Sequence, residues 1–295
     1  MEFDKDLQSI QEVRNLVAQA VAAQKELARM TQDQVDHICC EIANACIARA
    51  VPLARMAVEE TGFGVWQDKV MKNLLGSQIT WESIRDMKTI GVIREDEGDG
   101  IMEIGVPMGV VAALIPSTNP TSTTMYKTLI SIKAGNAIVI SPHPNAKNCI
   151  LETVKVIKEA ARKAGAPDGI IQVITIPTIQ ATDALLKHKD IGIILATGGE
   201  AMVKAAYSSG NPALGVGPGN GPAFIERSAN IAKAVGRIFD SKLFDNGTIC
   251  ASEQSIITER CIEKDVIAEV EARGGYFLSP DESDRLSGYI MRANG

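Results

Sequence analysis

Cys250 is the residue of this sequence best placed to act as a nucleophile. It lies in the stretch 246–252, which contains a glycine and has no helical or strand periodicity. A cysteine attacks carbonyl carbon as a thiolate, so it needs access to substrate and a lowered pKa. No histidine lies near it in sequence, so a Cys–His pair is not predicted, and a packed thiol is the alternative.

Asn119 could supply the hydrogen-bond donor that such a nucleophile requires. It lies in the loop 116–122, directly after an apolar run at 109–115, and two prolines restrict the backbone of this loop. A rigidly placed asparagine can direct its NH2 group at a developing oxyanion. Thr121 or Ser122 is expected to be the N-cap of the next helix, and the alternative is a capped turn in which Asn119 is only a turn residue.

Three further loops have the residue types that bind a nucleotide. The stretch 141–145 precedes a helix, 197–200 contains paired glycines before a helix, and 215–221 alternates glycine with other residues. Helix starts offer unpaired N–H groups to anions, and glycine lets a ligand approach the backbone. The G-x-G-x-x-G fingerprint is absent, so a dinucleotide site would be of another design, and each loop alone is also consistent with a simple turn.

The helices and strands that must position these loops follow a pattern typical of an α/β domain. Helical spacing of apolar residues covers about 7–89, a hairpin pattern covers 91–106, and strand-like runs then alternate with helices. The strand-like runs are 109–115, 137–141, 170–174, 191–196 and 222–226. This order predicts a Rossmann-type parallel sheet with helices on both faces, whose ligands bind at the carboxyl ends of the strands.

Composition excludes several other classes of protein. The 295 residues have a net charge of −6 and 4% aromatic residues, which argues against nucleic-acid binding. No apolar run approaches the length of a membrane span, and the acidic start does not resemble a signal peptide, so we expect a cytoplasmic protein. Six irregularly spaced cysteines and three histidines predict neither a disulfide framework nor a metal site. Cys39, Cys40 and Cys46 are expected to be packed inside helices.

Taken together, four motifs strongly resemble the CoA-acylating branch of the aldehyde dehydrogenase superfamily. They are IPSTNPTST, SPHPNAK, ILATGGEAMVKAAYSSGNPALGVGPGN and FDNGTICASEQ. The chain is most similar to the N-terminal aldehyde dehydrogenase part of the bifunctional aldehyde–alcohol dehydrogenases and to standalone acetaldehyde dehydrogenases. The resemblance extends from the helical start to about residue 279.

The resemblance implies a role for each matching residue. Cys250 matches the nucleophile, and Asn119 matches the residue that stabilises the oxyanion together with the backbone N–H of Cys250. No metal is implied, and the superfamily binds NAD without the usual glycine fingerprint. The residues that match its NAD-binding surface are Leu114, Ile115, Pro116, Ser117, Thr118, Asn119, Ser141, His143, Pro144, Thr197, Gly198, Gly199 and Gly217.

The acyl acceptor is expected to be coenzyme A. Hydrolytic relatives have a glutamate base in the segment equivalent to GVGPGN, whereas this chain has no carboxylate there. The expected reaction oxidises a short-chain aldehyde with NAD and CoA to an acyl-CoA, and it also runs in reverse. Acetaldehyde is the first candidate, followed by propanal, succinate semialdehyde and sulfoacetaldehyde. The alternatives are an acyl-phosphate reductase and a non-catalytic assembly fragment.

The resemblance also predicts the domain organisation. Residues 1–239 are expected to form the NAD-binding domain, and 240–295 the start of an incomplete second α/β domain, because superfamily chains normally continue further. The hairpin at 91–106 resembles the protruding oligomerisation hairpin of the family, so a homo-oligomer is expected. The expected partners are therefore the aldehyde, CoA and further copies of the chain, without nucleic acid or membrane.

Overall fold

The computed structural model describes residues 4–290 and divides into two compact units. The first unit contains the residues up to 218 together with 245–250, and the second contains 219–244 and the residues from 251 onward. The predicted division into 1–239 and 240–295 stays a prediction, and its boundary lies inside helix α10 (Ile231–Leu243). Each unit is described by itself.

Five parallel strands form the sheet of the first unit, in the order β5-β4-β3-β6-β7. Their bounds are β3 Val110–Ile115, β4 Ala137–Pro142, β5 Ile171–Val173, β6 Ile191–Thr197 and β7 Ala213–Val216. Every residue of β3 and β4 is buried, as expected for a parallel sheet covered on both faces. The predicted Rossmann-type sheet is therefore confirmed, with β7 as a strand that the sequence pattern did not predict.

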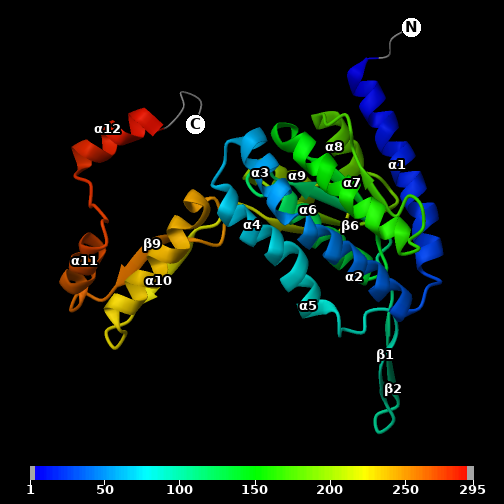
Figure 1. Ribbon diagram of the computed structural model, residues 1–295, viewed down its shortest axis with the longest axis horizontal. Coiled ribbons are helices and arrows are strands. Elements are labelled where there is room, and N and C mark those ends of the chain that lie inside the picture. Colours follow the sequence, from blue (N-terminus) through cyan, green and yellow to red (C-terminus); the bar gives the residue numbers. More distant parts are fainter. Residues whose placement is uncertain (1–3, 291–295) are drawn as a thin grey trace. The chain divides into compact units, whose positions relative to one another are not determined.

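Helices cover both faces of this sheet (Figure 1). Helices α6 and α7 follow β3 and β4 and pack on one face, while α1, α8 and α9 pack on the other. The remaining helices of the unit lie outside or beside these layers. The bounds of all the helices in this unit are α1 Lys5–Leu27, α2 Gln32–Ala48, α3 Ala50–Thr61, α4 Trp66–Leu74, a π-helical turn η1 Leu75–Ile79, α5 Thr80–Ile84, α6 Pro120–Lys133, a 3-10 turn η2 Pro144–Ala146, α7 Lys147–Lys163, α8 Ile179–Leu186 and α9 Glu200–Tyr207.

Local sequence signals explain several of these boundaries. Thr31 and Gln34 form a capping box at the start of α2. Gly62 ends α3 with a φ of 70°, the left-handed conformation that glycine adopts without strain. Cys39 and Cys46 are fully buried in the core, as predicted, whereas Cys40 is half-buried.

The predicted hairpin is also present, as antiparallel strands β1 (Gly91–Asp96) and β2 (Ile101–Gly105). Apolar side chains on it are exposed, among them Ile101 and Ile104. At its base, the Gln32 side-chain oxygen accepts hydrogen bonds from the backbone N–H groups of Thr89 and Ile90. The segment that leads into the hairpin is thereby bonded to helix α2.

The second unit contains the apolar run 222–226, and this corrects one expectation. The run forms β8 (Gly221–Ile225), which pairs in parallel with β9 (Glu253–Thr258) in a separate sheet. An apolar run predicts a strand but not its partner, and β9 lies 32 residues further along the sequence at their paired first residues. Helices α10 and α11 (Glu263–Ala272) pack on each other around a small core, and α12 (Pro280–Ile290) follows; the 3-10 turn η3 (Phe244–Gly247) leads back to the first unit.

The strand order identifies the edge where a ligand should bind. From β3 the chain moves outward through β4 to β5, then returns to place β6 on the other side of β3. Loops that leave β3 and β6 at their carboxyl ends therefore diverge to opposite sides. In open parallel sheets such a switch point forms the ligand crevice.

The described residues contain neither a single membrane-spanning helix nor a cluster of metal ligands. No single helix within 4–290 is long and apolar enough to cross a membrane; α2 and α3 together would pass by length and composition, with a 64° bend between them. In the same part of the chain, no group of three His, Cys, Asp or Glu side chains is arranged to hold a metal ion.

We predict that Gly192→Ala destabilises the sheet. Gly192 lies at the bulge where the β3–β6 register shifts, and an added Cβ would lie 1.9 Å from the Met108 carbonyl oxygen. Because backbone cannot move aside as a flexible side chain can, the expected cost is about 2–3 kcal/mol, measured by chemical denaturation. Gly98→Ala, with only a side-chain oxygen 3.4 Å away, is the control. A Gly192 variant as stable as this control would contradict the close approach.

Candidate active site

The residues that match the NAD-binding surface gather at one edge of the five-stranded sheet. They end or follow β3, β4, β6 and β7 at the carboxyl ends of these strands. The strand register pairs Leu114 with Ser141 on one side and with Ala196 on the other, and Thr197 with Val216. The predicted loops therefore belong to one edge, although they are up to about a hundred residues apart in sequence.

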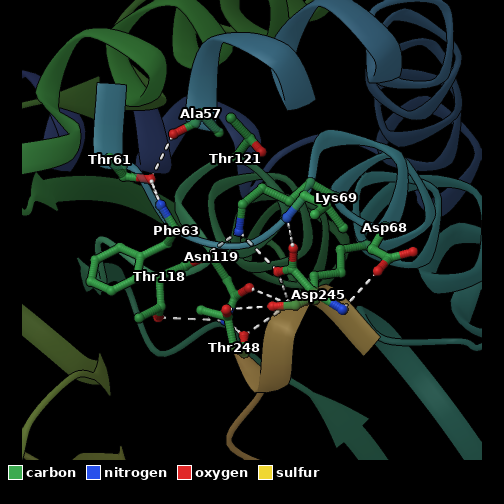
Figure 2. A network of polar contacts seen from close by, with 12 residues as sticks. Ala57, Thr61, Phe63, Asp68, Lys69, Thr118, Asn119, Thr121, Asp245 and Thr248 are labelled. Atoms are coloured by element: carbon green, nitrogen blue, oxygen red, sulfur yellow. Dashed lines mark hydrogen bonds and ion pairs between the residues drawn. The ribbon is translucent and has the colours of Figure 1, made fainter. Parts of the chain in front are cut away.

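Asp245 connects this edge to helix α4. Its side chain is fully buried, and one carboxylate oxygen accepts hydrogen bonds from the ammonium groups of Lys69, at 2.9 Å, and Lys72. The other oxygen accepts from the backbone N–H of Val65 at 2.8 Å, and the Asp245 N–H donates to Asp68 at 2.7 Å. Figure 2 shows Asp68, Lys69 and Asn119 gathered around this carboxylate. Residues 245–250 are thereby fixed to the first unit.

Lys72 also bonds to the predicted oxyanion donor. Its ammonium donates to the side-chain oxygen of Asn119 at 2.8 Å and to the backbone carbonyl of Thr248 at 2.8 Å. Burial lowers the pKa of Lys72, while the hydrogen bond to Asp245 acts in the opposite direction. The carboxylate thus compensates for part of the cost of burying this ammonium.

Asn119 has a position that corrects one expectation about the loop. It is itself the N-cap of α6, with Pro120 as the first helical residue, rather than Thr121 or Ser122. Its side chain makes no capping bond. Instead, its Nδ2 donates to the Thr248 carbonyl at 3.2 Å, so the amide reaches the segment that contains Cys250 (Figure 2).

Cys250 follows an unusual backbone segment and is exposed. Asp245, Asn246 and Gly247 all have positive φ, at 52°, 54° and 71°. Asp, Asn and Gly tolerate this left-handed region better than other residues, which explains why these residue types occur at 245–247. Tyr126 of α6 lies close by: burial raises its pKa, a hydrogen bond with Thr197 lowers it, and Cys250 adds to the rise.

The helix starts at this edge differ in whether an anion can reach them. At α7, the Glu60 carboxylate already accepts from the N–H groups of Asn148, at 2.8 Å, and Cys149, at 2.6 Å. His143 Nδ1 accepts from the Asn145 N–H at 3.1 Å, so that histidine caps the short turn η2. Glu60, which is distant in sequence, therefore already occupies the N–H groups that an anion would need at this helix start.

Helix α9 has an open start. Gly199 is its N-cap, with no side-chain capping bond, and the space that a Cβ would occupy there has no atom within 4 Å. The first N–H groups of a helix attract anions through their partial positive charge. The residues present at 197–199 therefore fit a dinucleotide diphosphate.

Lys127 lies beneath the same edge. Its buried ammonium donates to the carbonyls of Leu114 and Leu195, each at 2.8 Å, and so connects β3 with β6 at the switch point. Burial lowers its pKa to about 7. A cation buried against carbonyls rather than a carboxylate loses its proton more easily.

Sequence reasoning missed Lys69, Lys72, Tyr126 and Lys127, and named Asp245 only as part of a motif. Lys69 and Lys72 lie one helical turn apart, a spacing that normally indicates a solvated face. The one available signal was the Asp-Asn-Gly run at 245–247, whose residues favour a left-handed turn. It does not indicate which cations face it.

Comparison with known proteins relates this geometry to a family. The Aldehyde dehydrogenase family is matched over residues 6–275. The chain is 44% identical over 284 residues to the bifunctional aldehyde-alcohol dehydrogenase AdhE of Escherichia coli, which covers 96% of this chain and 32% of that protein. The chain therefore spans about a third of the length of that relative.

Two solved structures are similar throughout. A probable aldehyde dehydrogenase from Listeria monocytogenes is 64% identical with a TM-score of 0.95, covering 99% of this chain and 65% of that one. An acetylating aldehyde dehydrogenase from Geobacillus thermoglucosidasius is 54% identical with a TM-score of 0.94, covering 100% of this chain and 65% of that one.

We predict that Asp245→Asn destabilises the protein by about 3–5 kcal/mol, because two buried ammonium groups lose their carboxylate. Chemical denaturation followed by circular dichroism measures the change. Asp183→Asn is the matched control, because it removes the same charge from an exposed helical pair with Lys187 and should cost less than about 0.5 kcal/mol. Equal costs for the two variants would show that the burial of Asp245 has no energetic consequence.

We predict that Lys127 makes stability depend on pH above neutrality. With a folded pKa of about 7, the amine is neutral in the folded state above that pH, while the unfolded state keeps its proton until near pH 10.4. The unfolded state therefore binds more protons, and stability rises with pH in this window.

The measurement is the unfolding free energy of the wild type minus that of Lys127→Met, at several pH values. This difference should rise by about 1.4 kcal/mol per pH unit from above pH 7 to about 9. The same subtraction with Lys187→Met, an exposed lysine, should stay flat. A flat line for Lys127 would contradict the lowered pKa.

Proposed function

The chain belongs to the aldehyde dehydrogenase family, and from this we propose that it oxidises a short-chain aldehyde to an acyl-CoA through a thioester on Cys250. Acetaldehyde is the first candidate substrate, NAD the oxidant and coenzyme A the acyl acceptor; the reaction also runs in reverse. The relatives named acetylating and bifunctional aldehyde-alcohol dehydrogenase support this choice.

One observation carries the proposal most directly. The Asn119 amide donates to the carbonyl of Thr248, two residues before the exposed Cys250. A carboxamide donor and a thiol thus lie next to the same short segment. An acyl-transfer site requires this pair: a nucleophile, and a donor for the oxyanion that its attack creates.

The proposed chemistry begins with addition. The Cys250 thiolate forms a C–S bond to the aldehyde carbon, and the carbonyl electron pair moves to oxygen. The Asn119 Nδ2–H and the backbone N–H of Cys250 donate to this oxyanion. As the C=O bond re-forms, the carbon loses its hydrogen with the electron pair, and a thioester remains on Cys250.

NAD would occupy the carboxyl edge of the sheet. The residues proposed to hold it are those already described at 114–119, 141–144, 197–199 and 217, of which the open N-terminus of α9 suits the diphosphate. When bound, NAD supplies the acceptor for the hydride that the substrate carbon loses. The residues of the chain orient the cofactor and the substrate and exclude groups that would compete for the substrate carbon.

Coenzyme A rather than water is proposed to accept the acyl group. Residues 215–221 contain no carboxylate, whereas hydrolytic members of the family have a glutamate base in the equivalent segment. Without a base, water is a poor nucleophile, and a general base typically contributes 10²-fold to 10⁴-fold. The CoA thiolate can then attack the thioester carbon and displace the Cys250 thiolate.

We also propose that the protein is a cytoplasmic homo-oligomer. The hairpin β1–β2 exposes Ile101, Met102 and Ile104, each more than half accessible. Exposed apolar side chains on a two-stranded hairpin are typical of an interface. The corresponding hairpin of the family contributes to oligomerisation.

We predict that Cys250→Ala abolishes CoA-dependent oxidation of acetaldehyde, lowering kcat by at least about 10⁴-fold because no thioester can form. NADH absorbance and acetyl-CoA formation are measured together in the purified protein. Cys261→Ala is the matched control, since Cys261 is also exposed and lies outside the proposed site. Activity retained by Cys250→Ala would refute the nucleophile assignment.

The acyl acceptor is tested with the wild type. Omitting CoA should leave at most a short burst of NADH followed by a rate about 10²-fold lower. Replacing CoA with inorganic phosphate should not restore the rate. Restoration by phosphate would favour an acyl-phosphate reductase, and no NADH under any condition would favour a non-catalytic protein.

A further inference from the structure

The orientation of the Asn119 amide is determined by Lys72. An ammonium group can only donate hydrogen bonds, so the atom that faces Lys72 Nζ at 2.8 Å must be the carboxamide oxygen. A flipped amide would bring its NH2 group against the ammonium. The Nδ2 end is thereby left to donate to the carbonyl of Thr248 at 3.2 Å, an oxygen that also accepts from Lys72.

Lys72 also fixes the segment that precedes the nucleophile. The same ammonium donates to the Thr248 carbonyl and to the Asp245 carboxylate. One group thus contacts the oxyanion donor and two residues of the segment 245–250, here called the cysteine loop. Lys69 differs in this respect. It donates to the Asp245 carboxylate and to the backbone carbonyl of Thr118, at 2.8 Å, rather than to a side chain of the proposed site.

We propose that Lys72 is a positioning residue for the acyl-transfer reaction: its ammonium sets the orientation of the Asn119 amide and its distance from the cysteine loop. This inference rests on the proposed function. Lys72 acts through Asn119, whose N–H groups would meet the oxyanion. A displacement of about 1 Å in such a donor can cost about 10²-fold in rate.

The lysine pair supplies a test that preserves the fold. Two ammonium groups share one carboxylate, so removing either ammonium leaves the Asp245 carboxylate paired with the other. Lys72→Met and Lys69→Met remove the same charge from side chains that are both nearly fully buried. The two variants should therefore lose similar amounts of stability, whereas only the first removes the contact with the Asn119 oxygen.

The experiment uses an acylation that needs neither NAD nor CoA. The Cys250 thiolate can attack p-nitrophenyl acetate, forming an acetyl thioester and releasing p-nitrophenolate, and the attack creates the same kind of oxyanion. The burst rate constant of p-nitrophenolate is measured in the wild type. We expect Asn119→Ala to lower it about 10²-fold to 10³-fold, and Lys72→Met about 10-fold to 10²-fold.

A double-mutant cycle separates positioning from a general structural effect. If Lys72 acts through Asn119, adding Lys72→Met to Asn119→Ala should lower the burst rate less than about 3-fold further. The proposal would be overturned if the double variant lowered the burst rate by the product of the two single effects. It would also be overturned if Lys69→Met lowered the burst rate as much as Lys72→Met. Thermal unfolding of all four variants checks that they are folded. If Lys72→Met does not fold, Lys72→Gln replaces it in the same cycle.

The outcomes also distinguish this inference from the proposed function. Suppose that the wild type shows a p-nitrophenolate burst that Cys250→Ala lacks, but forms no NADH from an aldehyde. This result would refute the proposed oxidation, while the double-mutant cycle would still test Lys72. Normal oxidation with independent Lys72 and Asn119 effects would refute the positioning role alone.

Discussion

Two buried ammonium groups around one buried carboxylate are the constraint on which the cysteine loop depends. Lys69, Lys72 and Asp245 are almost completely inaccessible to water. Removing charges from water is costly unless the partners are well arranged and fully hydrogen-bonded. The carboxylate meets this condition through both lysines and the Val65 N–H. These contacts hold Asp245, and with it the left-handed turn of the loop that ends at Cys250.

The parallel sheet brings the loops together at one edge, but it does not determine which ligand each loop can bind. Parallel strands end at one edge, so every βα loop becomes a possible ligand contact. These loops differ in whether the first N–H groups of the following helix are already hydrogen-bonded to a side chain. Helix α9 begins at a glycine with free space above it, whereas the first N–H groups of α7 are occupied by Glu60. Two helix starts at the same edge of the sheet therefore differ in their capacity to bind an anion.

Much of the fold and part of the site could be predicted from the sequence, for physical reasons. The buried runs of β3, β4 and β6 are continuously apolar or nearly so, and the flanking helices have clear spacing. Strand β7 was missed because ALGV is short and rich in small residues, and β9 because four of the six residues of EQSIIT are polar. Cys250 and Asn119 were predicted as site residues from the order of the motifs, and these assignments stay predictions. The buried lysines were not predicted, because local periodicity cannot distinguish a charge facing solvent from one facing a carboxylate that is distant in sequence.

The sequence separation within the charge cluster has a consequence during protein synthesis. Asp245 follows Lys69 by 176 residues. At roughly 5–20 residues per second, a ribosome needs about 10 to 35 s to add this stretch. Throughout that interval, helix α4 of the nascent chain has two lysines whose eventual counter-ion has not yet been translated, so they remain hydrated. The final closure of this region must therefore come late, after the rest of the parallel sheet has been translated.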